Sequence, residues 1–414
     1  MSKEENRKNF SKYVSQNILG MIGFSCYVLA DSYFISIAKG ADGLTALNLV
    51  MPLYSIIFSI GEMIGVGSAI RYAISKIKKD ADADDYFWNA LIWCIMSSMI
   101  FVFAGIFFSA DIMRVLGADE HIVAVGDNYT KIFMCFAPMF MCNYVTNAFV
   151  RNDGAPGIAM SATLFSSLFS IVFDYILMFP MNLGMEGAAL ATALSPIIGM
   201  GICSIHFFSK KSSVRLVVCK PSVRKLVAGC QLGISAFVGE MSSAVITLAF
   251  NFVILKLAGN VGVAAYGVVA NIAIVTTAVF NGVAQGSQPL ISSCFGRGDK
   301  DGCTQLKRMG YTTAFVLAAV MYSILFIFAG QFVAVFNSEG SEMLRLYATE
   351  GVKLYFIGIF FAGINIVGGG AFSATEDAFK AAVVSVARGF VLILGAVFVM
   401  SALFGMTGVW LAYA

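Results

Sequence analysis

Long apolar segments dominate the pattern of hydrophobic and polar positions along this chain. Segments of about twenty or more residues recur between short charged or glycine-rich breaks, and each is long enough to cross a bilayer as a helix. We expect an all-α polytopic membrane protein. Its predicted spans are residues 15–37, 44–72, 87–109, 122–149, 157–180, 185–208, 226–257, 264–293, 309–332, 344–373 and 379–402, with the start of a twelfth from 407 to the end.

Composition supports a membrane protein and excludes several other classes. The 414 residues are 59% hydrophobic and 12% charged, with a mean hydropathy of +0.83, whereas soluble domains carry about 25% charged residues. The net charge is only +3, and the basic residues lie in loops, so we expect no nucleic-acid partner. The nine cysteines form no CxxC pair, which favours free buried thiols over disulfides or a metal site. The sequence contains no HExxH, GxSxG or clustered-histidine motif, so we expect neither an enzyme nor a bound cofactor.

Basic residues alternate between the breaks. One set of breaks carries the charged N-terminal stub, "RYAISKIKK", "RNDG", "SKKSSVRLVVCKPSVRK" and "GRGDKDGCTQLKR", while the other set carries few basic residues. By the positive-inside rule the first set is cytoplasmic. We therefore expect a multi-pass protein of the plasma membrane with a cytoplasmic N-terminus.

The chain also resembles itself. A shift of 219 residues places "GADGLTALNLV" (40–50) on "GNVGVAAYGVV" (259–269), and a shift of 221 places "LGMEGAALAT" (183–192) on "FGMTGVWLAY" (404–413). Six crossings return the chain to the same side, so the halves are parallel pseudo-repeats. We predict an N-terminal lobe of six helices (1–209), a basic cytoplasmic linker (210–225) and a C-terminal lobe (226–414) with helices 7–11 and a truncated twelfth. The alternative is that glycine-rich helices merely look alike.

Two carboxylates lie deep within predicted spans of the N-terminal lobe. Asp31 in "VLADSYF" and Asp174 in "SLFSIVFDYILMFP" are each about 16 or 17 residues from the start of their span, or roughly 25 Å up the helix. An ion at such depth costs about 2.5–3.5 kcal/mol or more. The two side chains must share protons, a cation or polar partners, and the alternative is a neutral acid that is hydrogen-bonded across helices.

Several motifs together resemble those of a known transporter family. They include "NGVAQGSQPLISSCFGRGDKDG" (281–302), "LADSYFISIAKGADGLTALNLVMPL", "FVRNDGAP", "FDYILMF" and "GMEGAALATALSP". The chain is similar, over nearly its whole length, to the multidrug and toxic compound extrusion (MATE) family. The resemblance implies an antiporter, coupled to H⁺ or Na⁺, that exports small amphipathic organic cations or drugs by alternating access. We expect it to work as a monomer in the lipid bilayer, without a cofactor.

The resemblance also implies which residues couple the ion. Asp31 and Asp174 fall on acidic positions of the family's first and fifth helices, and Thr192 falls on a hydroxyl of the sixth. Four residues before Asp174 the family often has asparagine, where this chain has Ser170. A hydroxyl in place of an amide weakens a cation-ligand site and favours a proton site.

Three other charged residues in predicted spans have open roles. Glu240 matches a glutamate of the family's sodium-coupled branch, and it could bind a cationic substrate, carry a proton or hydrogen-bond within the bundle. Glu62, near the cytoplasmic end of its span, could receive cations from the cytosol or pair with a lysine. Arg388 matches a family arginine, for which we expect structural pairing, with snorkelling to the interface as the alternative.

A flippase for lipid-linked oligosaccharides is the alternative function within the wider superfamily. Such a protein needs several basic side chains facing its cavity to hold a pyrophosphate, and only Arg388 is clearly intramembrane by sequence. A membrane enzyme is a more remote alternative.

Overall fold

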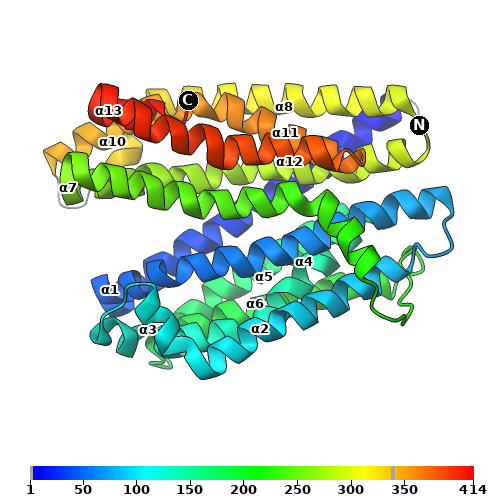
Figure 1. Ribbon diagram of the computed structural model, residues 1–414, viewed down its shortest axis with the longest axis horizontal. Helices are drawn as coiled ribbons and strands as arrows, with labels where there is room; N and C mark the ends of the chain where they lie inside the picture. Colours follow the sequence, from blue (N-terminus) through cyan, green and yellow to red (C-terminus); the bar gives the residue numbers. More distant parts are fainter. Residues whose placement is uncertain (1–2, 337–340) are drawn as a thin grey trace.

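The computed structural model describes residues 3–336 and 341–414, and its regular structure there is entirely helical (Figure 1). The elements are α1 (Lys3–Lys78), α2 (Asp85–Val115), α3 (Glu120–Cys135), α4 (Ala137–Asn152), α5 (Pro156–Met178), α6 (Gly184–Phe207), α7 (Val223–Gly296), α8 (Lys300–Ile327), α9 (Ala329–Phe336), α10 (Glu342–Tyr355), the 3₁₀ turn η1 (Phe356–Gly358), α11 (Ile359–Ala374), α12 (Ala378–Val386), the π-helical η2 (Ala387–Leu392) and α13 (Ile393–Leu411).

The predicted spans are present. Among the described residues, nine helices are long and apolar enough to cross a membrane, with α1 divided into Lys3–Gly40 and Asp42–Lys78. The pair α3 and α4, bent by 45°, makes a tenth. A break at Gly259 divides α7 into two helices and adds an eleventh. The multi-pass helical architecture predicted from hydropathy is therefore confirmed.

Backbone conformation repeats in the same register as the sequence. Gly40 and Gly259 interrupt α1 and α7 with nearly the same dihedrals, φ 60° and ψ −142° against φ 62° and ψ −155°. Gly184 and Gly405 share a positive φ of 51° and 59°. Residues with a Cβ rarely adopt these conformations, so each pair of glycines marks an equivalent turn in the two halves. The two pseudo-repeat lobes are confirmed.

The lobes interlock at one end of the bundle. Figure 1 shows α2–α6 in one half and α8–α13 in the other, while α1 starts beside α8 and crosses to the first half and α7 starts in the first half and crosses to the second. The N-terminus lies at the end that also carries the connection from α6 to α7. We call this end the linker face. Near it, Phe10 and Val14 of α1 are buried in the apolar core of the C-terminal lobe, and Leu232 of α7 is buried in the core of the N-terminal lobe. The start of each lobe's first helix thus packs into the core of the other lobe.

Glycines make this interlock possible. A Cβ at Gly286 would lie 2.7 Å from the Cα of Val14, and one at Gly282 would lie 2.6 Å from the Cα of Ile18. On the pseudo-symmetric side, a Cβ at Gly67 would clash with the carbonyl of Gly229, and one at Gly233 would clash with the carbonyl of Met63. Close backbone approach supplies the packing that lipid does not drive by itself. We call these contacts the glycine seam.

The connection between the lobes is fastened to the N-terminal lobe. At its start, the backbone N–H of Ser213 donates to Asp153 at 2.9 Å. Towards its end, Trp88 Nε1 donates to the carbonyl of Cys219 at 2.9 Å, and the N–H of Ser222 donates to Asn89 Oδ1 at 2.7 Å. Lys225, in the first turn of α7, then pairs with a carboxylate of α2. The nine cysteines are free; four are buried, and Cys26 is exposed, so the expectation of buried thiols is wrong for Cys26.

The seam predicts a position-specific effect of one methyl group. Gly233→Ala should reduce the free energy of unfolding by about 1–3 kcal/mol, because the added methyl group would clash with the carbonyl of Met63. A backbone carbonyl, unlike a side chain, cannot avoid the clash by changing rotamer. The matched control is Gly239→Ala on the same helix, where an added Cβ meets nothing within 4 Å. Thermal unfolding of both variants in detergent checks this, and equal midpoints would contradict the seam.

Candidate functional site

The predicted N-lobe residues converge in the structure. Asp31 lies on the first half of α1, Ser170 and Asp174 on α5, and Thr192 on α6, and α5 packs against both of the other helices. Ser170 and Asp174 are four residues apart and therefore share a face of α5. All four are buried, with exposed fractions of 6% for Asp31, 0% for Ser170 and Asp174, and 1% for Thr192. The charges of Asp31 and Asp174 are close enough to interact.

These four side chains have polar atoms without protein partners. Asp31 Oδ1, both carboxylate oxygens of Asp174, Ser170 Oγ and Thr192 Oγ1 are buried and accept or donate no hydrogen bond within the described part of the chain. Most buried polar atoms in proteins are hydrogen-bonded, so a cluster of exceptions requires an explanation. Carboxylate and hydroxyl oxygens together are suited to hold a proton or a hard cation such as Na⁺.

Three tyrosines surround the carboxylates and were not predicted from the sequence. Tyr27 lies one helical turn before Asp31, and Tyr27 and Tyr129 are within electrostatic range of both carboxylates. The hydroxyls of Tyr54 and Tyr129 hydrogen-bond to each other, and the ring of Tyr54 stacks on Phe133 at 3.6 Å between centroids. The spacing of Tyr27 and Asp31 is a signal visible in the sequence, whereas the Tyr54–Tyr129 contact joins distant spans.

A second polar cluster lies between the lobes. Glu62 of α1 and Glu240 of α7 are close enough for their charges to interact, and Tyr144 of α4 is within range of both. Gln285 Nε2 donates to Glu62 Oε1 at 3.1 Å, and Arg151 Nη1 donates to Gln285 Oε1 at 2.7 Å. Glu62 therefore pairs with a glutamine amide rather than with a lysine. Arg151, in the last turn of α4, is a further buried cation.

Arg388 lies in the π-helical segment η2. It is half-buried and lies near the Tyr413 hydroxyl. Among the described residues no carboxylate forms a salt bridge with it. Its structural role stays a prediction.

Asp153 shows what a structurally paired carboxylate looks like in this protein. It caps the end of α4 within "FVRNDGAP", and its side chain is 3% exposed. His206 Nε2 lies 2.8 Å from Asp153 Oδ2, which also accepts from Ser212 Oγ at 3.1 Å and from the N–H of Ser213. The Ser213 and Tyr72 hydroxyls donate to the other oxygen. Asp153 accepts hydrogen bonds at both oxygens, whereas Asp174 accepts none from the part of the chain that the structure describes.

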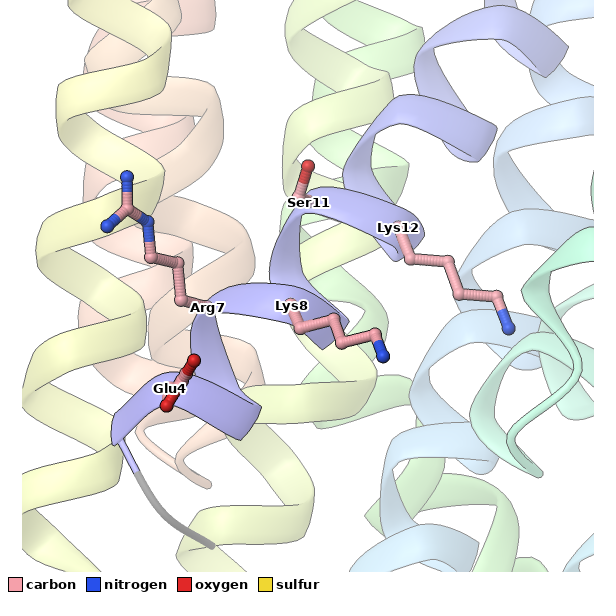
Figure 2. Close-up of a pocket in the computed structure, with 5 residues that line it drawn as sticks. All are labelled: Glu4, Arg7, Lys8, Ser11 and Lys12. Carbon is pink, nitrogen blue, oxygen red and sulfur yellow. The ribbon is translucent and has the colours of Figure 1, made fainter.

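Two surface cavities differ in their relation to these sites. One of about 470 Å³ is lined by residues that include Ile37 and Met178, six positions after Asp31 and four after Asp174. It thus lies roughly 6–9 Å further along the same two helices, away from the linker face. The other, of about 560 Å³, is lined by exposed residues at the start of α1. Figure 2 shows Arg7 pointing away from Lys8 and Lys12, so this cavity gathers no convergent groups.

Comparisons with known proteins show which family the chain belongs to. The MatE family model matches residues 17–176 and 236–409. The multidrug export protein MepA of Staphylococcus aureus is 28% identical over 404 residues, which are 95% of this chain and 86% of that protein. A crystal structure of MATE in complex with MaL6 has a TM-score of 0.92 at 20% identity, over 99% of this chain and 92% of that one. An outward-facing MATE-family multidrug resistance transporter has a TM-score of 0.89 at 20% identity, over the same shares. On this family match and the shared fold, the chain belongs to the MATE family of transporters.

Proposed function

We propose that the protein is a cation-coupled antiporter that exports small amphipathic organic cations, with Asp31 and Asp174 as the coupling carboxylates. The observation that carries the proposal is the group of buried, unpartnered oxygens on Asp31, Ser170, Asp174 and Thr192. The similarity to multidrug export proteins over most of both chains supports the class of cargo. The linker face is cytoplasmic, because the basic breaks gather there.

The coupling step follows from the placement of the two carboxylates. With the linker face closed, the cavity that Ile37 and Met178 help to line lies beyond the two carboxylates, towards the opposite face of the membrane. A proton or Na⁺ that enters there neutralises one of the two negative charges and so relieves the mutual repulsion and desolvation that make an unloaded, doubly charged site costly. The ion drives transport only if it binds one access state more tightly than the other.

The cargo is cationic, and the interlobe carboxylates fit it. Glu62 and Glu240 belong to different lobes and are close enough to interact. A lipophilic cation between them would be attracted by both charges in a water-poor setting, where electrostatic interactions are stronger than in bulk water. The ring of Tyr144, near both carboxylates, can add a cation–π contact.

Asp174→Asn tests the coupling role. The amide keeps the size of the side chain but cannot carry a proton or a negative charge, so gradient-driven ethidium efflux from proteoliposomes should fall by at least tenfold. Imposed ΔpH and ΔNa⁺ are applied separately to the parent, and the gradient that drives efflux names the ion. Efflux that survives in Asp174→Asn would remove this residue from the mechanism.

Stability separates the two kinds of buried aspartate. Asp153→Asn should lower the free energy of unfolding by about 1.5–3 kcal/mol, since it weakens charge-assisted hydrogen bonds to a buried acceptor. Asp174→Asn should leave the thermal midpoint unchanged or raise it, because it removes a buried charge that has no protein partner. A large loss of stability in Asp174→Asn would assign that residue a structural role instead.

Glu240→Gln tests the cargo site. Removing one of two carboxylates around a lipophilic cation should cost about 1–2 kcal/mol, or roughly 5- to 30-fold in affinity. We expect the KM for tetraphenylphosphonium to rise by such a factor while the same ion gradient still drives efflux. An unchanged KM would exclude Glu240 from the cargo site.

A further inference from the structure

Gln285 reaches across the glycine seam from the C-terminal lobe. It lies on the second half of α7, between Gly282 and Gly286, whose backbones approach Ile18 and Val14 of α1. Its side chain is therefore placed where the two lobes are in closest contact, at the linker face. No sequence motif assigned a role to this residue.

The N-terminal lobe holds both ends of the Gln285 amide. Arg151 Nη1 donates to its oxygen at 2.7 Å, and its nitrogen donates to Glu62 Oε1 at 3.1 Å. The amide oxygen must face the guanidinium of Arg151, and the amide nitrogen must face the carboxylate of Glu62, so only one orientation of the amide satisfies both partners. Arg151 also lies 3.5 Å from Asn17 Oδ1, so the clamp includes the first helix.

Burial of its two charged partners distinguishes this clamp from the interlobe ion pairs of Glu376. Arg151 is 5% exposed and Glu62 is 9% exposed. Glu376 of the C-terminal lobe also pairs with Arg71 and, at 3.6 Å, with Lys78, but these side chains lie at the rim, 22–46% exposed. The Gln285 side chain is itself half-buried. Exposed ion pairs are screened by water and salt, whereas charge-assisted bonds to more deeply buried groups are stronger. The amide of Gln285 is the inner contact of the closed face.

Glu62 belongs to two clusters at once. One of its oxygens accepts from Gln285, and its charge is also within range of Glu240, the other carboxylate of the cargo site. A cation bound at Glu62 and the amide of Gln285 therefore compete for the same group.

We propose that Gln285 is the lock of the linker face, and that re-forming its bond to Glu62 expels the exported cation from that carboxylate. The competition for cation rests on the proposed function, while the locking contact stands on the hydrogen bonds alone. Closure of the linker face and cation binding at Glu62 then exclude each other. Because linkage is reciprocal, a cation on Glu62 must favour the open linker face by the same factor.

Thiol labelling measures the lock. Val14 is 4% exposed and lies in the seam, so Val14→Cys in a chain without the native cysteines reacts with a polar maleimide only when the linker face opens. We expect Gln285→Leu to raise the labelling rate at least fivefold. Gln285→Asn, which keeps the amide but shortens its reach, should give an intermediate rate. The control is Gln288→Leu, the same change on the same helix, where the side chain lies beside Gly370 of its own lobe.

Tetraphenylphosphonium tests the competition. It should raise the labelling rate in the parent, should have no further effect in Gln285→Leu, and should bind Gln285→Leu at least fivefold more tightly. Glu62→Gln should abolish its effect on labelling. Labelling in Gln285→Leu at the rate of the parent and of Gln288→Leu would overturn the lock. If no variant binds the cation but Gln285→Leu still labels faster, the lock stands, and the competition fails together with the proposed cargo.

Discussion

Close contact between backbones at the linker face is the constraint on which the arrangement of the two lobes depends. Gly67, Gly229, Gly233, Gly282 and Gly286 bring helices of opposite lobes to distances that a Cβ would prevent. Lipid is as apolar as a leucine side chain, so burial alone does not hold these helices together, and dispersion at short range must. The start of the first helix of each lobe then reaches into the core of the other, and the polar clamp around Gln285 forms between these closely packed helices.

The protein treats its buried charges in two different ways. Asp153 accepts several hydrogen bonds and holds the interlobe connection to the N-terminal lobe. Asp174, whose side chain is also buried, has no donor at either oxygen among the described residues. The hydrogen bonds of Asp153 offset the free-energy cost of burying its charge. For Asp174 that cost must be offset by a bound proton or cation. This difference in pairing separates a structural carboxylate from a candidate for coupling better than depth in the membrane does.

Much of the fold could be predicted from the sequence, because membrane spans and backbone turns leave local signals. Apolar runs located the spans, and the shifts of 219 and 221 residues matched glycines that prove to share a left-handed backbone, Gly40 with Gly259 and Gly184 with Gly405. The convergence of Asp31 and Asp174 followed from equal depth. The clamp of Gln285 by Arg151 and Glu62 could not be predicted in this way, since it depends on the rotation of helices from different lobes.

The fastened connection limits how the lobes can move relative to one another. Hydrogen bonds at Ser213, Cys219 and Ser222 and the ion pair of Lys225 attach the segment before α7 to the N-terminal lobe. Little slack therefore remains between the lobes, and Leu232, two turns further along α7, is still buried in the N-terminal core. Opening the linker face has to bend α7 or break these bonds. Gly229 and Gly233 lie shortly after Lys225 on α7, and glycines make a helix easier to bend. The residues that close the glycine seam are therefore also the residues at which α7 can bend when the linker face opens.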